Sequence, residues 1–75
     1  MPKLPILRPR QVITALKRDG WYEVKGRGGH RQLKHPTKPG RVTLPVHGDR
    51  PLRRDIIASI LHQAGLTADE LQKLL

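Results

Sequence analysis

The residues of this chain that could do chemistry gather around His30, which follows a glycine-rich segment and opens a stretch that alternates like a β-strand. Gly26, Gly28 and Gly29 have no side chains, so the backbone there can approach a ligand closely. A neutral imidazole can take the proton of a ribose 2′-hydroxyl as that oxygen attacks the adjacent phosphate, and cations can stabilise the developing charge. The nearby cations are Lys25, Arg27, Arg31, Lys34 and Lys38. The segment therefore predicts cleavage of RNA with His30 as the general base.

A second interpretation of the same segment stays open at this point. An exposed histidine among cations can contact a phosphate without reacting with anything. Both interpretations make the segment a surface that binds RNA through its phosphates. The predicted RNA contacts are Lys25, Arg27, Gly28, Gly29, Arg31 and Lys34.

Other chemistries fit the sequence poorly. His30 and His35 would point to opposite faces of one predicted strand, and neither the histidines nor the acidic residues follow a metal-ligand pattern, so we expect no metal and no other cofactor. There is no cysteine, and the single serine lies inside a predicted helix without the sharp turn that exposes a nucleophile. His47, which closes a predicted strand, is the next candidate if His30 does not react. Trp21 and Tyr22 are the only aromatic residues, which argues against RNA-binding folds that stack several bases.

Composition favours a nucleic-acid partner. Fifteen Lys and Arg against six Asp and Glu give the 75 residues a net charge of +9. The alternative is a merely basic, solvated surface; a membrane surface fits less well, because the cations do not follow one face of an amphipathic helix. Without cysteines, a signal-peptide pattern or an apolar run of about 20 residues, the chain is expected in the cytoplasm. We expect one domain, residues 1–75, in which residues 1–7 form a flexible arm.

The hydrophobic pattern predicts the order α-β-β-β-α followed by a short C-terminal helix, which is an α+β fold. Pro9 occupies the first position of the first helix, and Gly20 ends it. The second helix starts at Arg53 or Arg54 and runs to about Ala64. A capping box precedes the last helix, residues 68–75.

Three strands are predicted at residues 21–25, 30–35 and 41–46. Tyr22 and Val24 share one face of the first strand, whereas Leu33 and His30 fall on opposite faces of the second. The expected result is a three-stranded antiparallel sheet with helices packed on one apolar face. His30 should then lie on the opposite, cationic face.

Five short motifs occur in a distinctive order and spacing. They are residues 17–21 (KRDGW), 28–30 (GGH), 41–47 (RVTLPVH), 57–66 (IASILHQAGL) and 69–71 (DEL). With these motifs the chain resembles, over nearly its whole length, the HicA family of small bacterial and archaeal mRNA interferase toxins.

This resemblance implies a double-stranded-RNA-binding-like α-β-β-β-α fold and ribonuclease activity on mRNA. It also implies neutralisation by a HicB-type antitoxin encoded beside the toxin, in a type II toxin–antitoxin system. The catalytic histidine of the family corresponds to His30. The family usually has Ser or Thr immediately before that histidine, whereas this chain has Gly29, so a weaker or non-cleaving member is an alternative.

The sequence thus predicts a metal-independent endoribonuclease toxin that acts on mRNA and is held by a HicB-type antitoxin covering the glycine turn and His30. Two hypotheses of other classes remain. One is a non-catalytic basic RNA-binding module. The other is a protein-interaction domain whose charge serves only to dock an acidic partner.

Overall fold

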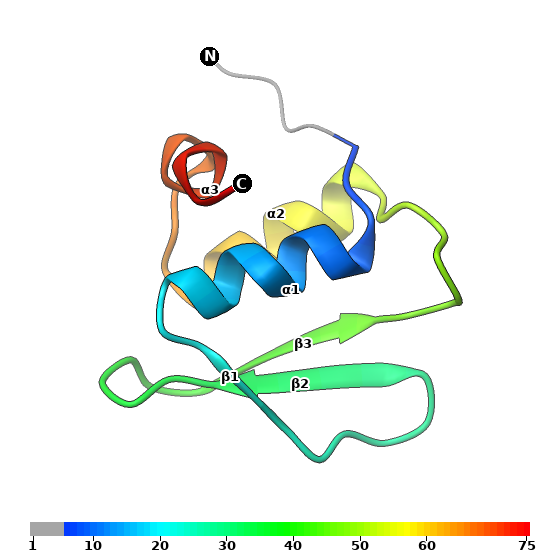
Figure 1. Cartoon of the computed structure of the whole chain (residues 1–75), viewed down its shortest axis with the longest axis horizontal. Helices are drawn as coiled ribbons and strands as arrows, with labels where there is room; N and C mark the ends of the chain where they lie inside the picture. The colour runs from blue at the N-terminus through cyan, green and yellow to red at the C-terminus, as the bar shows by residue number, and fades with distance from the viewer. Residues whose placement is uncertain (1–5) are drawn as a thin grey trace.

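The computed structural model describes residues 6–75, in which three helices and three strands form two layers (Figure 1). The strands form one antiparallel sheet in the order β1-β2-β3, and α1 and α2 both lie on the same side of it. The elements are α1 (Pro9–Arg18), β1 (Tyr22–Val24), β2 (His30–Lys34), β3 (Arg41–Pro45), α2 (Arg54–Ala64) and α3 (Ala68–Leu74). The predicted α+β order with a short C-terminal helix is therefore confirmed, as is its likeness to a double-stranded-RNA-binding fold.

The helices begin and end at the residues that the sequence indicates. Pro9 is the first residue of α1, and Gly65 ends α2 in a left-handed conformation. At the start of α3, the backbone N–H of Thr67 donates to the Glu70 carboxylate at 2.9 Å, and the Glu70 N–H donates to the Thr67 hydroxyl at 3.1 Å. The bond from the Thr67 backbone lowers the pKa of Glu70. The predicted capping box is thus confirmed.

The core lies between the sheet and the helices. Leu33, Val42 and Leu44 point from β2 and β3 toward the helices and are fully buried. They share one apolar cluster with Ile57 and Ile60 of α2. Since burial of one such side chain contributes about 1.5–3 kcal/mol, this face of the sheet cannot be exposed without large loss of stability.

Tyr22 and Val24 share one face of β1, as predicted, and the structure shows which face it is. Their cross-strand partners are Lys34 and Gln32, whose side chains point away from the helices. The reason is Trp21, which is only 2% exposed and enters the core just before the strand begins. Alternation counted from Trp21 directs Tyr22 outward, and Tyr22 is 47% exposed.

The predicted flexible arm at residues 1–7 lies mostly outside the described residues, which begin at residue 6. Leu7 does not fit that prediction, because it is 5% exposed and belongs to the core cluster. It pairs with Leu52 in an isolated antiparallel bridge, and the Leu52 N–H donates to the Leu7 carbonyl at 2.7 Å. The chain before α1 is therefore fixed to the loop before α2.

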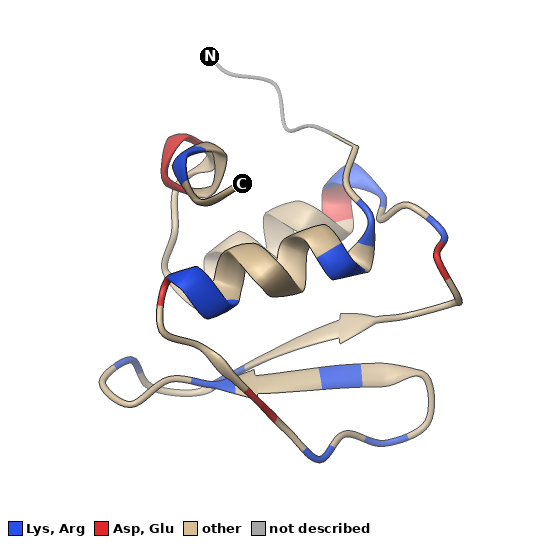
Figure 2. Cartoon of the chain, viewed as in Figure 1, with Lys and Arg blue, Asp and Glu red and all other residues tan. Residues whose placement is uncertain are grey.

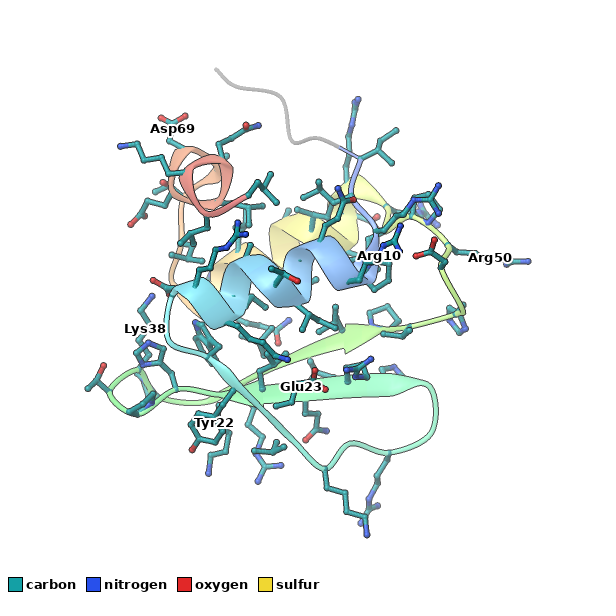
Figure 3. The ribbon with its side chains drawn as sticks, in the orientation of Figure 1. Arg10, Tyr22, Glu23, Lys38, Arg50 and Asp69 are labelled. Atoms are coloured by element: carbon teal, nitrogen blue, oxygen red, sulfur yellow. The ribbon has the colours of Figure 1, made fainter. Side chains whose placement is uncertain are left out.

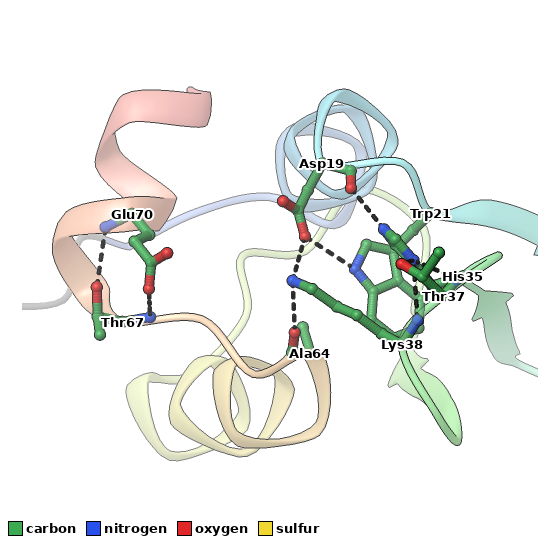
Figure 4. A network of polar contacts seen from close by, with 8 residues as sticks. All are labelled: Asp19, Trp21, His35, Thr37, Lys38, Ala64, Thr67 and Glu70. Atoms are coloured by element: carbon green, nitrogen blue, oxygen red, sulfur yellow. Dashed lines mark hydrogen bonds and ion pairs between the residues drawn. The ribbon is translucent and has the colours of Figure 1, made fainter.

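One end of the sheet is held by a group of polar contacts that we call the polar corner, made of Asp19, Trp21, His35 and Lys38 (Figure 4). The Nδ1 atom of His35 accepts the backbone N–H groups of Thr37 and Lys38, both at 3.1 Å. Nε2 therefore carries the proton and donates it to the Asp19 carbonyl at 2.7 Å. The His35 ring also meets the Trp21 ring edge-on, with 5.2 Å between centroids.

Lys38 completes the polar corner. Its ammonium group donates to the Asp19 carboxylate at 2.7 Å and to the Ala64 carbonyl at 3.1 Å. These bonds join the end of α1 and the β2–β3 turn to the end of α2 (Figure 4). Lys38 was expected beside His30, and the structure corrects that expectation, because Lys38 lies beyond the opposite end of β2.

No helix in residues 6–75 is long and apolar enough to span a membrane.

Candidate functional site

His30 is the first residue of β2, and it lies opposite Pro45 of β3. Its backbone N–H donates to the Arg27 carbonyl at 3.0 Å and closes a tight turn. Gly28 has a φ of +57° at the first central position of that turn, which type II′ turns require and few other residues adopt. The His30 side chain is exposed on the face away from the helices, as predicted, and its ring has no hydrogen-bond partner among the described residues.

The backbone around His30 is tightly confined. A Cβ atom at Gly26 would collide with the His30 carbonyl oxygen, so the two segments can pass each other only because position 26 is glycine. On the other side, the Val46 N–H donates to the Gly29 carbonyl at 2.7 Å. A Cβ atom at Gly29 would lie 3.3 Å from the Val46 carbonyl oxygen, which is close but can be relieved by a small shift. These contacts fix the position of the His30 backbone between the glycine-rich loop and the end of β3.

Two of the predicted RNA contacts lie in the loop that leads to His30. Lys25 and Arg27 are exposed there, on the loop between β1 and β2 (Figure 2), and neither makes an ion pair in the described chain. Lys34 lies on the same face of β2 as His30, about 13 Å further along the strand. The structure thus brings Lys25, Arg27 and the two turn glycines to His30, and places Lys34 at the far end of the same face.

Arg31 lies elsewhere. Its cross-strand partner is the buried Leu44, so its side chain is on the helix side of the sheet. There the Arg31 guanidinium grips the Glu23 carboxylate with nitrogen–oxygen distances of 2.5–2.9 Å, and Lys17 lies 3.4 Å from the same carboxylate. The hydrogen bond from Arg31 holds the pKa of Glu23 below its ordinary value. Arg31 is thus paired with Glu23 and lies on the opposite face of the sheet from His30.

The face of the sheet that points away from the helices carries further polar residues that the sequence prediction missed. We call it the outer face. Its residues are Tyr22 and Val24 of β1, His30, Gln32 and Lys34 of β2, and Arg41, Thr43 and Pro45 of β3. Glu23, the only acidic residue in the three strands, points to the other side. Burial of Trp21 would have assigned Tyr22 to this face, because adjacent residues of a strand point to opposite sides.

A family model described as the HicA toxin of bacterial toxin–antitoxin systems matches residues 9–66. The chain belongs to this family. No curated protein sequence matches it. The matched part of this HicA family member runs from the first residue of α1 to just past the end of α2 and includes the whole sheet with His30. Membership identifies the protein as the toxin of a toxin–antitoxin pair and implies an antitoxin partner.

The surface around His30 is open rather than a pocket. A hollow of about 530 Å³ is lined by Ile6 and residues 51–55, and His30 does not contribute to it. A second, of about 260 Å³, lies at the β3–α2 loop and includes Pro45, His47 and Arg50. No three His, Asp or Glu side chains of residues 6–75 come together where they could hold a metal ion. An exposed histidine on a flat basic surface suits a polymer better than a small molecule.

The loop that carries His47 is fixed to α1. Asp49 accepts from the Arg8 guanidinium at 2.6 Å, and Arg10 lies 3.7 Å from the same carboxylate. Figure 3 shows Arg10 and Arg50 at the end of the molecule where this loop lies. His47 is exposed and lines the hollow beside Pro45, the cross-strand partner of His30.

Proposed function

We propose that this HicA family member is a metal-independent endoribonuclease that cleaves mRNA in the cytoplasm, with His30 as general base. The observation that supports this most is the contrast between the two histidines at the ends of β2. His35 uses both ring nitrogens within the fold, whereas the ring of His30 has no partner in the described chain and faces solvent beside Lys25 and Arg27. A base needs such an unengaged nitrogen within reach of substrate.

The proposed reaction uses the RNA itself as nucleophile. His30 takes the proton of a ribose 2′-hydroxyl as the 2′-oxygen bonds to the adjacent phosphorus. The bond from phosphorus to the 5′-oxygen breaks, and that oxygen takes a proton from solvent, which the open surface admits. The products are a 2′,3′-cyclic phosphate and a 5′-hydroxyl. Lys25 and Arg27 stabilise the negative charge on the phosphorus centre, and the N–H groups of the glycine turn assist.

The test is incubation of the purified protein with single-stranded RNA in excess EDTA. We expect cleavage with 2′,3′-cyclic phosphate ends, detected by mass spectrometry, and none when the 2′-hydroxyl at the cleaved position is replaced by hydrogen. The His30→Ala protein serves as the control for a contaminating nuclease. Cleavage that stops in EDTA, or that continues at a 2′-deoxy position, would contradict the mechanism.

RNA binding through the cations near His30 also predicts a strong dependence on salt. Each phosphate contact with a single strand lowers the log–log slope of affinity against salt concentration by about 0.7. Charge reversal at Arg27 should reduce the affinity and make this negative slope less steep. An affinity that hardly changes between low and high salt would argue against this surface.

We propose further that the antitoxin is a HicB-type protein that covers the glycine turn and His30. An acidic surface would complement Lys25 and Arg27. Charge reversal at these two residues should then weaken antitoxin and RNA binding together. Arg31 is a poor choice for that test because it is paired with Glu23. If charge reversal abolished RNA binding but left antitoxin binding unchanged, the antitoxin would inhibit from a separate surface.

A non-catalytic RNA-binding module is the second candidate, and Gly29 favours it. The family resemblance places a hydroxyl residue at this position, and this chain lacks it. Retention of RNA without any cleavage, in the presence or absence of EDTA, would select this candidate.

A further inference from the structure

We propose that the outer face of the sheet binds single-stranded RNA, with Tyr22 stacking on an unpaired base and with Lys34 and Arg41 contacting phosphates. This inference rests on the proposed function, since the bound strand would be the substrate that reaches His30. It adds a second contact region, at the opposite end of β2 from the glycine turn.

Tyr22 is unusual among the large apolar side chains of the described residues because it is exposed on the polar outer face, at the first position of the edge strand β1. It is 47% exposed, and the ring projects from the side of the sheet that the helices leave open (Figure 3). Its ring contributes nothing to the core, which Trp21 fills from the adjacent position. An exposed tyrosine leaves the apolar surface of its ring in contact with water, which is unfavourable. A base stacked on the ring would cover that surface.

Two cations follow this tyrosine in a row across the sheet. Tyr22 is the cross-strand partner of Lys34, and Lys34 is the partner of Arg41. The Arg41 guanidinium donates to the Gln32 side-chain oxygen at 2.9 Å, which holds it along the outer face. An aromatic ring beside two cations can receive a base and the phosphates next to it.

The distribution of acidic residues leaves this face with uncompensated positive charge. Glu23, the one carboxylate in the strands, points to the helix side, where Arg31 and Lys17 neutralise it. Within the strands, the outer face therefore carries Lys34 and Arg41 and no negative charge. Charge complementarity thus favours a polyanion as the occupant.

The distance to His30 fits a strand that contacts both ends. Lys34 and His30 lie on the same face of β2, four residues apart in the strand, which corresponds to about 13 Å. A few nucleotides of extended RNA can cover this distance. A duplex cannot offer an unstacked base to Tyr22, because its bases are paired inside the helix. The geometry therefore favours single-stranded RNA, with one base held at a fixed distance from the cleaved bond.

The test measures binding without cleavage, so that its result does not depend on whether His30 is the catalytic base. The probe is a fluorescent 2′-O-methyl oligonucleotide of about ten residues, which covers a typical single-strand site. We expect Tyr22→Ala to weaken its affinity by about 5- to 150-fold, the range that loss of one base stack produces, and Tyr22→Phe to bind within about twofold of wild type. Ile6→Ala removes a comparable exposed apolar side chain elsewhere and should bind as wild type.

The cations are tested by the salt dependence of the same binding. Lys34→Gln and Arg41→Gln should each make the slope of log affinity against log salt concentration less steep by about 0.7. Lys73→Gln on α3 should leave this slope unchanged. Circular dichroism verifies that each variant is folded, which we expect because all three side chains lie outside the core.

Three results would overturn the proposal. The first is unchanged affinity of Tyr22→Ala for the oligonucleotide, and the second is equal competition by duplex RNA. The third is that the outer-face variants keep the RNA affinity of the wild type but no longer co-purify with the co-expressed antitoxin. That result would assign the outer face to the protein partner. Failure of the wild-type protein to cleave ordinary RNA would refute the ribonuclease mechanism but would not alter these binding results.

Discussion

The two ends of β2 each carry a histidine among cations, but the two surroundings are opposite in character. At one end, His35 lies in the polar corner with both ring nitrogens bonded, and Lys38 is bonded to Asp19 and Ala64. At the other end, His30 follows a glycine turn and faces solvent, and the nearby Lys25 and Arg27 have no ion-pair partner in the described chain. The difference shows that residue type and nearby charge do not reveal whether a histidine ring is engaged in the fold. The hydrogen-bond partners do.

The largest effect is expected from removing His30, the proposed general base. His30→Ala should lower the rate of RNA cleavage by about 10²- to 10⁴-fold, the usual contribution of a general base, and should abolish growth inhibition. Stability and RNA affinity should stay nearly unchanged because the ring contacts solvent. The measurements are cleavage rate, thermal unfolding and oligonucleotide binding. A mutant that still cleaves at a similar rate would move the chemistry elsewhere, first to His47.

The opposite pattern is expected at the polar corner. His35→Ala removes the partner of the Thr37 and Lys38 N–H groups and of the Asp19 carbonyl, so the free energy of unfolding should fall by about 1–3 kcal/mol. Cleavage per folded molecule should be retained. Urea unfolding and activity measured well below the melting temperature test the two parts. If His35→Ala lost activity without losing stability, the division between the two ends would be wrong.

The glycine turn allows a sharper comparison between two neighbouring positions. Gly26→Ala should destabilise the protein by about 1–3 kcal/mol, because the new methyl group meets the His30 carbonyl. Gly29→Ser should change stability by less than about 1 kcal/mol, because its Cβ has only the Val46 oxygen nearby, at 3.3 Å. If a hydroxyl before the histidine assists the reaction, as the family resemblance implies, Gly29→Ser should also cleave RNA faster. Slower cleavage by a well-folded Gly29→Ser protein would show that glycine is needed here.

The smallest effect concerns the ion pair that separates Arg31 from the site. Because the folded state lowers the pKa of Glu23 below its ordinary 4.5, this carboxylate stabilises the protein above that pH and loses its contribution as the pH falls through the folded value. Wild type should exceed Glu23→Gln in stability by up to about 1 kcal/mol near neutral pH, and the difference should vanish in acid. Urea unfolding across pH measures it, with Asp55→Asn as the control for loss of one exposed carboxylate. A difference that grew on acidification would contradict the assignment.

Much of the fold could be predicted from the sequence because the signals were local. Pro9, Gly65 and the capping box at Thr67 each fix a helix end through contacts within a few residues. The exposure of His30 followed from its alternation with Leu33, which the core requires to point inward. These predictions needed no knowledge of distant partners.

The sequence was less informative where the position of a side chain depends on residues far away in the sequence. Trp21 lies just before a strand of only three residues and Tyr22 opens it, so hydrophobicity alone did not show which of these adjacent aromatic residues enters the core. Arg31 finds Glu23 only after β1 and β2 have paired, and Lys38 finds Asp19 only when the β2–β3 turn meets α1. Proximity in sequence therefore overstated the number of cations around His30.

The bridge between Leu7 and Leu52 has a consequence for the order in which a newly made chain can fold. His30 lies near the middle of the sequence, but α2, one of the two helices on the inner side of its sheet, follows Leu52. Leu7 gains its bridge partner only once Leu52 has been made. Until α2 has been synthesised, the cluster around Leu33 and Leu44 lacks Ile57 and Ile60, and α1 alone covers that side of the sheet. A nascent chain that already contains the glycine turn therefore still lacks part of the core on which the strand of His30 packs.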